Sequence, residues 1–389
     1  MLNRLIPLGI PLAWLNLINE KKRFFAAVAG IMFAVTMMMF QMGLNSAMFS
    51  QVVSPHLKMR GDLVLVSKQY EYFGISKGFA RRRLIQAQAL GSVTGVASIY
   101  AGSLPMLNPA TGATREVFIL AFDPTEKPFA DEAIEENQYR LKRDGVALYD
   151  VLSRSELGPF AELLKKDGEV VTEVGNKKIT VEGLFEMGPT FVADGNMLMN
   201  KDTFLEIWPG GNQGLISLGL VTLKPGTDPN AAAAELREYL PDDVRIMTNA
   251  EFIQKEKEYW SERTPIGFVI TASMIVSLIV GAVIVYQILY TDVADHLEEY
   301  ATLKSIGFRD SYFVSLILQE SVILSVLGFI PGTAITALLY YLTRTIANMP
   351  TYLNPLNCAL VLGLTLLMCM TAGALATRKL RQANPAEIF

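Results

Sequence analysis

Long apolar runs alternate with one large polar region along this chain. The runs cover 24–49, 266–290, 312–343 and 355–377, and each is long enough for an α-helix that must cross a bilayer core, which takes about 20 residues. No run between 50 and 263 is both long and apolar enough to span. The pattern predicts an α+β membrane protein with four transmembrane helices and a large mixed α/β domain between the first and second spans.

Basic residues next to the first and last runs predict the orientation of the chain. They are Lys21, Lys22, Arg23, Arg378, Lys379 and Arg381. Because Lys and Arg gather on the cytoplasmic side of a membrane, we expect both termini in the cytoplasm and the domain at 50–263 outside. The segment 1–23 is expected to be a helix lying in the cytoplasmic interface. A cleaved signal peptide is the alternative for this segment.

The polar region contains both strand and helix patterns. Strands are expected at Asp62–Ser67, Arg115–Phe122, Lys178–Phe185, Asn196–Met199 and Leu218–Leu223. Helices are expected at Arg81–Leu90, Val151–Leu157, Phe160–Lys166 and Ala231–Leu240. The charged segment Asn249–Arg263 is expected to be a stalk helix that runs into the second span after a break at Pro265, and a plain solvated helix is the alternative.

Composition excludes several classes of function. A net charge of -4 gives no basic excess for nucleic-acid binding. Cys358 and Cys369 both fall in the last apolar run, so the outer domain has no disulfide framework. His56 and His296 are far apart in sequence, which argues against a metal or histidine-based catalytic site. The sequence has no Walker A loop, so we expect it to bind no nucleotide cofactor and to be no enzyme itself.

The polar segment 291–311 separates the second and third spans. Val293, Leu297, Tyr300, Leu303 and Ile306 recur at three- and four-residue spacing, which predicts a short helix with one apolar stripe. Gly307 follows as a helix stop, since glycine accepts the left-handed conformation there. Such a helix on the cytoplasmic side offers a docking surface, although an ordinary interfacial helix fits the same pattern.

Three stretches resemble a known family. EEYATLKSIGF resembles the loop between the second and third spans of FtsX-like, MacB-type ABC transporter permeases, in which Glu, an aromatic residue, Ala, Leu, a basic residue and Gly recur at this spacing. GLFEMGPTFVADGNMLMN, preceded by GVALYDVLSRSELGP, is similar to the outer domain of the DevC subfamily. The tail ANPAEIF is similar to the ending that is common in the family.

The resemblance implies a role for the polar loop. In this family the loop is a coupling helix that lies in a groove on a separate ATPase subunit, which binds ATP and Mg²⁺. The residues implied in coupling are Leu297, Glu298, Glu299, Tyr300, Thr302, Leu303, Lys304 and Gly307. The resemblance also implies a porter-like part of the outer domain at about 51–101 and 215–263, with an inserted subdomain at about 102–214.

The resemblance further implies the permease subunit of a MacB-type ABC exporter in a bacterial inner membrane. Such a subunit works as a homodimer by mechanotransmission, with a periplasmic adaptor of the DevB-like, membrane-fusion type and a TolC-like outer-membrane channel. The implied cargo is a glycolipid or another amphiphile. Two alternatives remain: an FtsX-like scaffold that regulates a cell-wall hydrolase, and a permease that releases lipoproteins.

A few polar and small residues within the spans are candidates for specific roles. Glu320 is an acid inside the third span, where we favour a structural role over a proton relay because no second acid or histidine lies within helical reach. Ser273, Ser277 and Gly281 in the second span, and Gly30 in the first, belong to rows of small residues that suit close helix contact. They are candidates for dimer packing, and ordinary packing within one chain is the alternative.

Overall fold

The computed structural model describes residues 14, 21–74, 77–190, 193–212, 214–295, 302, 306–308, 310–347 and 349–382. The chain divides into two compact units. The helical unit comprises Met1–Ala47 and Ile266–Phe389, and the sheet unit comprises Met48–Pro265. The predicted fold class, four apolar helices with a mixed α/β domain inserted after the first, is confirmed. The predicted interfacial helix at 1–23 lies outside the described residues apart from Trp14 and 21–23.

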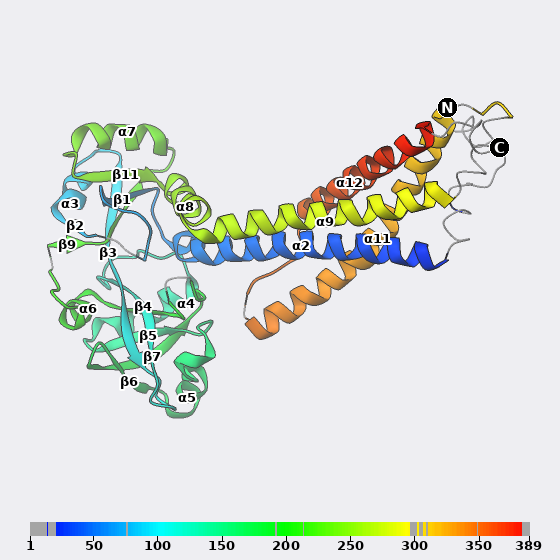
Figure 1. Cartoon of the computed structure of the whole chain (residues 1–389). Helices are drawn as coiled ribbons and strands as arrows, with labels where there is room; N and C mark the ends of the chain where they lie inside the picture. The colour runs from blue at the N-terminus through cyan, green and yellow to red at the C-terminus, as the bar shows by residue number, and fades with distance from the viewer. Residues whose placement is uncertain are drawn as a thin grey trace. The chain divides into compact units, whose positions relative to one another are not determined.

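Four helices among the described residues are long and apolar enough to cross a membrane (Figure 1). They are α2 (Lys21–Lys58), α9 (Pro265–Asp295), α11 (Asp310–Ala347) and α12 (Pro355–Gln382). Each extends beyond the apolar run that predicts it, because a helix continues past the apolar stretch until a stop signal or a competing contact ends it. Pro331 lies inside α11, and the helix continues through it.

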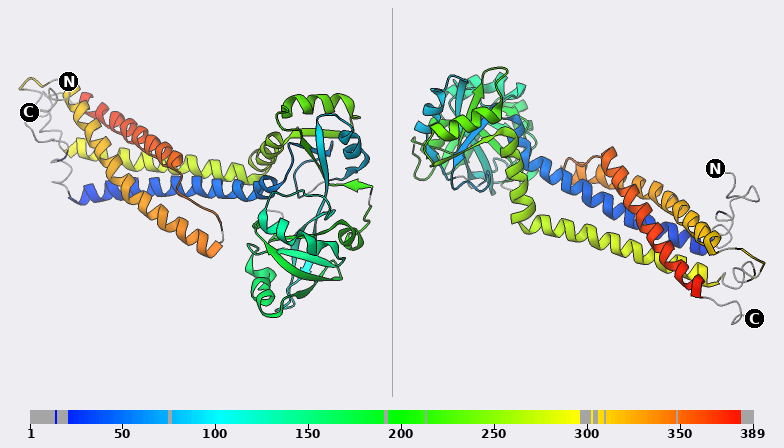
Figure 2. Two further views of the ribbon diagram at one scale, coloured as in Figure 1. Left: turned by 180° about the vertical axis from the view of Figure 1, so that it is seen from behind. Right: turned by 90° about the horizontal axis from the view of Figure 1, so that it is seen from above.

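Glycines set the close contacts inside the helical unit, in which α2 and α9 run side by side (Figure 2). A Cβ atom at Gly332 of α11 would lie 2.8 Å from Cγ1 of Val35 and 3.0 Å from the carbonyl oxygen of Met32, both on α2. A Cβ atom at Gly281 of α9 would lie 2.6 Å from Cβ of Ala34. Only glycine leaves room for these approaches, so α2 packs tightly against two other helices of the same chain.

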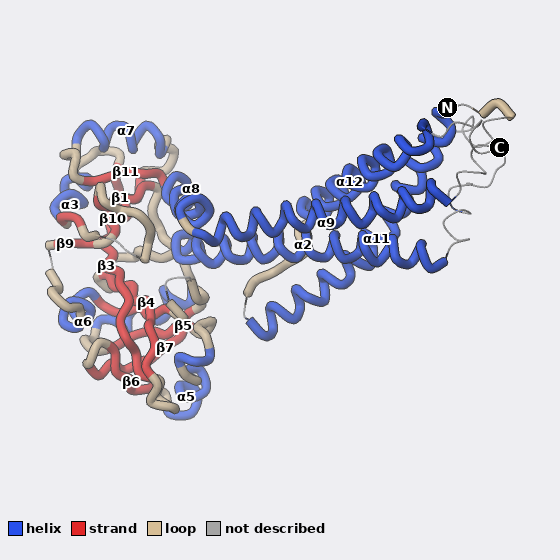
Figure 3. Tube along the Cα trace, viewed as in Figure 1, coloured by secondary structure: helices blue, strands red, loops and turns tan. Residues whose placement is uncertain are grey.

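The sheet unit is built on a nine-stranded mixed sheet with the order β11-β1-β10-β3-β4-β8-β5-β7-β6 (Figure 3). Its strands are β1 (Leu63–Ser67), β3 (Val93–Leu107), β4 (Thr114–Phe122), β5 (Val146–Asp150), β6 (Val170–Val174), β7 (Lys177–Phe185), β8 (Asn196–Asn200), β10 (Leu218–Leu223) and β11 (Val244–Thr248). The pairs β4–β8 and β5–β7 are parallel, and the other pairs are antiparallel. The short strands β2 (Phe79–Ala80) and β9 (Leu215–Ile216) pair separately.

The long strand β3 divides the sheet into two halves. Its first part, up to Ile99, pairs with β10, and its second part, from Tyr100, pairs with β4. We call the sheet of β11, β1, β10 and the start of β3, with the helix α8 that packs on it, the proximal half; the remaining strands form the distal half. The distal half folds back on itself, because Met106 near the end of β3 pairs with Val174 at the end of β6.

Apolar side chains point to both faces of the sheet and make a core on each. In β1, Leu63 and Leu65 belong to one core while Val64 and Val66 belong to the other, as strand alternation requires. Helices that contribute to the first core are α3 (Arg82–Gln88), α5 (Phe160–Asp167), α6 (Lys201–Ile207) and α7 (Pro229–Tyr239). Those that contribute to the second are α4 (Glu132–Asn137), η2 (Gln138–Lys142) and α8 (Asn249–Glu258).

One predicted helix is wrong. Val151–Leu157 does not form an α-helix; the chain turns after β5 and then makes the short 3₁₀-helix η3 (Ser155–Leu157). The backbone N–H of Leu152 donates to Oδ1 of Asp150 at 3.1 Å, and that of Ser153 donates to the carbonyl oxygen of Asp150 at 3.0 Å. These local bonds compete with helical ones and hold the segment in a turn.

Candidate functional site at the end of helix α2

Most of the predicted coupling residues lie outside the described residues. These are Leu297, Glu298, Glu299, Tyr300, Leu303 and Lys304. Thr302 and Gly307 are described, and both are exposed. Gly307 has a φ of 108°, a backbone conformation that favours glycine. This is consistent with the expected helix stop, and the coupling role itself stays a prediction.

The intramembrane candidates lie inside the helical unit. Glu320 is fully buried on α11, and its role stays open. The Ser277 hydroxyl donates to the carbonyl oxygen of Ser273 on its own helix at 2.8 Å. Gly30 faces Ile284, and Gly281 faces Ala34 and Met368, all within one chain. Gly30 and Gly281 therefore make close contacts within the chain, and the role of these residues and of Ser273 and Ser277 in a dimer stays a prediction.

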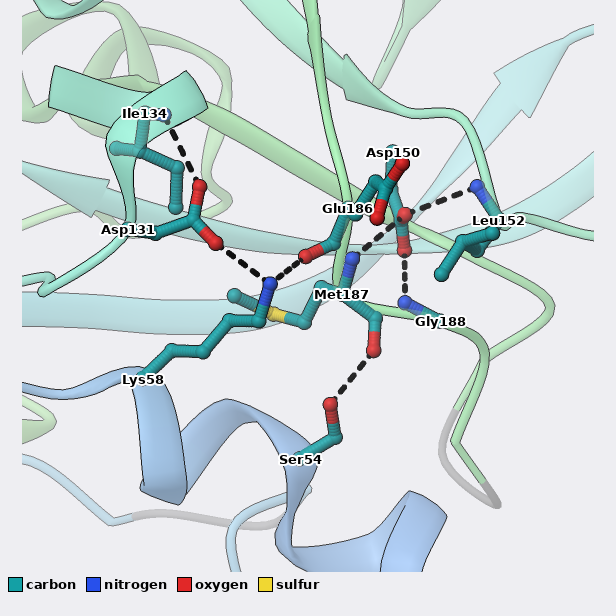
Figure 4. Close-up of polar contacts among 9 residues, drawn as sticks. All are labelled: Ser54, Lys58, Asp131, Ile134, Asp150, Leu152, Glu186, Met187 and Gly188. Carbon is teal, nitrogen blue, oxygen red and sulfur yellow. Dashed lines mark hydrogen bonds and ion pairs between the residues drawn. The ribbon is translucent and has the colours of Figure 1, made fainter. Parts of the chain in front are cut away.

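The last turns of α2 bring polar side chains against the distal half of the sheet unit. The Ser54 hydroxyl donates to the carbonyl oxygen of Met187 at 2.7 Å, and Lys58 Nζ donates to Oδ2 of Asp131 at 2.6 Å and to the carbonyl oxygen of Glu186 (Figure 4). The backbone contributes as well, since the N–H of Ala130 donates to the carbonyl oxygen of Lys58 at 2.8 Å. These contacts fix the end of α2 to two segments that are distant in sequence.

Asp150 holds in place the segment 186–188, which the end of α2 contacts. It is fully buried, and its Oδ1 accepts from the N–H of Met187 at 2.9 Å while its Oδ2 accepts from the N–H of Gly188 at 2.7 Å (Figure 4). The Asn196 side-chain amide also donates to Oδ2, at 2.8 Å. Burial raises the pKa of Asp150, and the hydrogen bonds from Asn196 and the backbone oppose that rise. Because several donors converge on this one carboxylate, the segment 186–188 is held in a single conformation.

The same end of α2 also contacts the proximal half. The His56 ring lies 4.9 Å from the ring of Phe73 and 4.7 Å from that of Phe252 on α8, measured between centroids. Helix α8 starts with a capping box, in which the Thr248 hydroxyl accepts from the N–H of Glu251 at 3.2 Å and the Glu251 carboxylate accepts from the N–H of Thr248 at 2.9 Å. The end of α2 is thus held by both halves.

The connection from α8 to α9 is built differently. Five residues, Tyr259–Arg263, form the π-helix η4, and Thr264 is extended, with φ -112° and ψ 153°. The Thr264 hydroxyl donates to the carbonyl oxygen of Trp260 at 2.6 Å. The Tyr259 ring stacks on that of Tyr72 at 4.5 Å. Helical hydrogen bonding is therefore interrupted just before the second membrane-spanning helix begins.

Sequence reasoning did not single out Ser54, Lys58, Asp131 or Asp150. The local sequence gives no signal for them, since Pro55 disfavours a helix interior and the structure nevertheless continues α2 to Lys58. The partners of Lys58 lie 73 and 128 residues further along the chain. No spacing pattern connects residues so far apart.

Two protein families match this chain. Residues 24–239 match the MacB-like periplasmic core domain, and residues 271–385 match the FtsX-like permease C-terminal region. The first match alone covers more than half of the chain's 389 residues. The chain belongs to the MacB-like and FtsX-like permease family. The family resemblance drawn from the sequence is confirmed at this level, and the DevC subfamily stays a prediction.

Individual relatives are distant. An uncharacterized ABC transporter permease of Methanocaldococcus jannaschii is 24% identical over 233 residues, a match that spans 57% of this chain and 57% of that protein. Among solved structures, the periplasmic region of MacB from Actinobacillus actinomycetemcomitans is 10% identical with a TM-score of 0.36, and the match covers 51% of this chain and 92% of that one. The extracellular domain of the noncanonic ABC-type transporter YknZ from Gram-positive bacteria is 12% identical with a TM-score of 0.32, over 48% of this chain and 99% of that one.

Proposed function

We propose that this permease-family chain is the membrane subunit of an ABC exporter that works by mechanotransmission. A separate ATPase binds ATP with Mg²⁺ and moves the loop at 291–311, and the membrane helices carry that movement to the sheet unit outside. The match to the FtsX-like permease region and the similarity to a protein named as an ABC transporter permease support this assignment. The chain itself binds no cofactor in this mechanism.

The observation that carries the proposal is the continuity of α2. The helix has 38 residues, with Pro55 inside its last turns, and at 1.5 Å per residue it is roughly 57 Å long, whereas a bilayer core is only about 30 Å thick. Its last turns are hydrogen-bonded into the sheet unit through Ser54 and Lys58. A helix that is longer than the membrane is thick and fixed at its far end transmits displacement to the outer domain.

Polar groups inside the helical unit favour pushing over conduction. Buried hydroxyls there donate to carbonyl oxygens of their own helix one turn back, as Ser321 does to Ile317 and Thr365 does to Val361, at 2.8 and 2.7 Å. Thr336 bonds in the same way to Gly332 at 2.9 Å. Each of these hydroxyl protons is used within its own helix, which fits a mechanism that acts on a substrate already outside the membrane.

The proposed assembly has several partners. We propose a homodimer in a bacterial inner membrane with both termini in the cytoplasm, two copies of an ABC ATPase, a periplasmic adaptor of the membrane-fusion type and a TolC-like outer-membrane channel. The proposed cargo is a glycolipid or another amphiphile, as in the DevC subfamily. The alternative functions are regulation of a cell-wall hydrolase and release of lipoproteins, either of which would take the place of amphiphile export.

A gentle detergent pull-down from the native membrane tests the proposal. Co-purification of an ABC ATPase together with a membrane-fusion adaptor is the expected result, with ATPase activity in the purified assembly. An ATPase with a cell-wall hydrolase or its activator, and no adaptor, would replace export by a scaffold role. Recovery of the chain without any ATPase would overturn both.

Topology has its own test. In a chain with Cys358 and Cys369 replaced by alanine, single cysteines are placed at Ala130, which is exposed in the sheet unit, and at Tyr300 in the loop. A membrane-impermeant thiol reagent is expected to label position 130 from outside and position 300 only after the membrane is opened. The reverse labelling pattern would contradict the proposed orientation.

A further inference from the structure

A second contact between α2 and α8 consists of buried ionisable groups. His56 on α2 and Glu256 on α8 are 0% and 1% exposed, and Tyr70, from the segment after β1, is 3% exposed. All three lie in the sheet unit. None of them belongs to the hydrogen-bond network of Asp150 described above.

The carboxylate of Glu256 is at the centre of this cluster. Its Oε1 accepts from the backbone N–H of Phe73 and its Oε2 accepts from the Tyr70 hydroxyl, both at 2.8 Å. Nε2 of His56 lies 3.7 Å from the same Oε2. Neither ring nitrogen of His56 has a hydrogen-bond partner among the described residues. The imidazole is therefore beside the carboxylate, at ion-pair distance, with its polar atoms otherwise unused.

Physical chemistry limits the charge that this cluster can hold. A buried carboxylate without a cation costs several kcal/mol, and a buried neutral imidazole with an unbonded N–H costs about 1–3 kcal/mol. Burial and the neighbouring Glu256 hold the pKa of Tyr70 well above its usual range, so Tyr70 stays a hydroxyl donor. One proton placed on the His56–Glu256 pair leaves the cluster neutral overall, whichever of the two groups carries it.

Other titratable groups around the pair do not supply the missing charge. Tyr72 lies in the same segment as Tyr70, and Lys58 on α2 is engaged by Asp131. Lys255 neighbours Glu256 on α8, where burial and then the nearby Arg245 and Arg263 lower its pKa. In the part of the chain that the structure describes, His56 is the only cationic side chain within 4.0 Å of the Glu256 carboxylate.

We propose that His56 and Glu256 share one proton and form a proton-dependent latch between the end of α2 and α8. While the proton is bound, the pair is neutral and the helices pack. When it is lost, the buried Glu256 carboxylate keeps the two donors Tyr70 and Phe73 but has no cation beside it, and α8 separates from α2. The latched form holds one proton more than the separated groups, so the latch is stable at low pH and weakens as pH rises. The latch would work in the same way whatever the protein transports.

Hydrogen–deuterium exchange of the full chain in lipid nanodiscs tests the latch. Protection of the α8 amides is measured at about pH 6 and about pH 9, on either side of neutrality, and is corrected for the intrinsic pH dependence of exchange. Amides of β4 in the distal half serve as the internal reference. We expect α8 protection relative to β4 to be about tenfold lower at the higher pH. A tenfold change in the opening equilibrium is the effect of about one pKa unit.

Glu256→Gln is the decisive variant. Its amide keeps an oxygen for the N–H of Phe73 and offers an N–H toward Tyr70 and His56, but it carries no charge at either pH, so α8 protection is expected to stay high at both. Glu258→Gln makes the same change at an exposed position two residues away and is expected to keep the wild-type pH response.

Two results would overturn the latch. In the wild-type chain, equal α8 protection at both pH values would show that no shared proton holds the helices; this comparison needs no variant to fold. A loss of protection in Glu256→Gln that parallels the wild type would show that other groups cause the pH response.

Discussion

Two segments join the helical unit to the sheet unit, and they differ in their construction. Helix α2 stays helical from Lys21 to Lys58, with Pro55 inside its last turns, whereas α8 and α9 are separated by a five-residue π-helix and an extended residue, Thr264. An unbroken helix moves as one body, and an interrupted one absorbs movement where its hydrogen bonding fails. In the mechanism proposed above, α2 would be the driving element and the α8–α9 connection, 259–264, would be a joint.

The two segments also differ in how the sheet unit holds them. The end of α2 has charged and polar contacts to 131 and 186–187 in the distal half. Helix α8 packs through Phe252 and the buried Glu256 on the proximal half. In the proposed mechanism, movement of α2 would act on both halves through these contacts, and movement of α9 would act through the joint.

Breaking α2 is expected to have the largest effect. Ser46 is exposed in the middle of the helix, and Ser46→Pro removes a helical hydrogen bond at a cost of about 3 kcal/mol. We expect the assembled complex to lose most of its coupled ATPase activity, while Ser46→Ala retains it. Ser261→Pro, in the joint, is expected to cost less because the helical pattern is already interrupted there. Equal losses at 46 and 261 would contradict the assignment of α2 as the driving element.

Changing the cytoplasmic end is the next prediction. Gly307 has a positive φ that a β-branched residue adopts only with strain, so Gly307→Val is expected to uncouple ATP hydrolysis from the membrane subunit. Leu297→Asp, which places a charge on the predicted apolar stripe, is expected to act in the same way. The control is membrane insertion, measured as the amount of the variant protein that is recovered from the membrane. Unchanged ATPase activity in the assembled complex would remove the coupling role from this loop.

Packing between α2 and α11 gives a smaller and local effect. At Gly332 an added Cβ meets Val35 and the Met32 backbone, whereas at Gly363 of α12 it meets nothing within 4 Å. Gly332→Ala is expected to destabilise the helical unit by about 1–3 kcal/mol through overpacking, and Gly363→Ala is the matched control with no loss. Thermal unfolding in detergent measures both. A lowered midpoint for both variants alike would point to a general effect of alanine and not to this contact.

The smallest predicted effect concerns the polar end of α2. Lys58→Met leaves Asp131 without its cation but still accepting from the N–H of Ile134. We expect a loss of about 1 kcal/mol in local stability, seen as faster amide exchange in α4. Lys58→Arg is expected to preserve most of the protection. Unaltered exchange in Lys58→Met would show that the Ser54 and backbone contacts suffice to hold α2.

Several elements were accessible to sequence reasoning because their signals are local. The four apolar runs predict α2, α9, α11 and α12, since span length depends only on consecutive residues. Short strand-like runs bounded by turn residues predict β1, β4, β7, β8 and β10. Strand β3 was missed because Gly95, Gly102 and Pro105 weaken its pattern; it is a strand because β10 and β4 both pair with it. Val151–Leu157 was mistaken for a helix because its spacing does not reveal the side-chain bond to Asp150.

The candidate site divides in the same way. The loop at 291–311 has a recognisable spacing within a few residues, and the family match at 271–385 agrees with the resemblance drawn from it. Ser54, His56 and Lys58 have no such signal. The polar partners of these side chains are 73 to 200 residues away, with Asp131 the nearest and Glu256 the farthest.

By itself, the sequence determined the number of spans, the presence of a mixed domain between the first two, and the family, because each depends on short-range patterns of apolar and turn residues. Tertiary structure alone decided that β3 is shared by both halves, that Gly30 and Gly281 pack within one chain, and that the end of α2 is fixed to both halves. Those features depend on which distant surfaces meet, and the free energy of a contact exists only once folding has brought its two partners together.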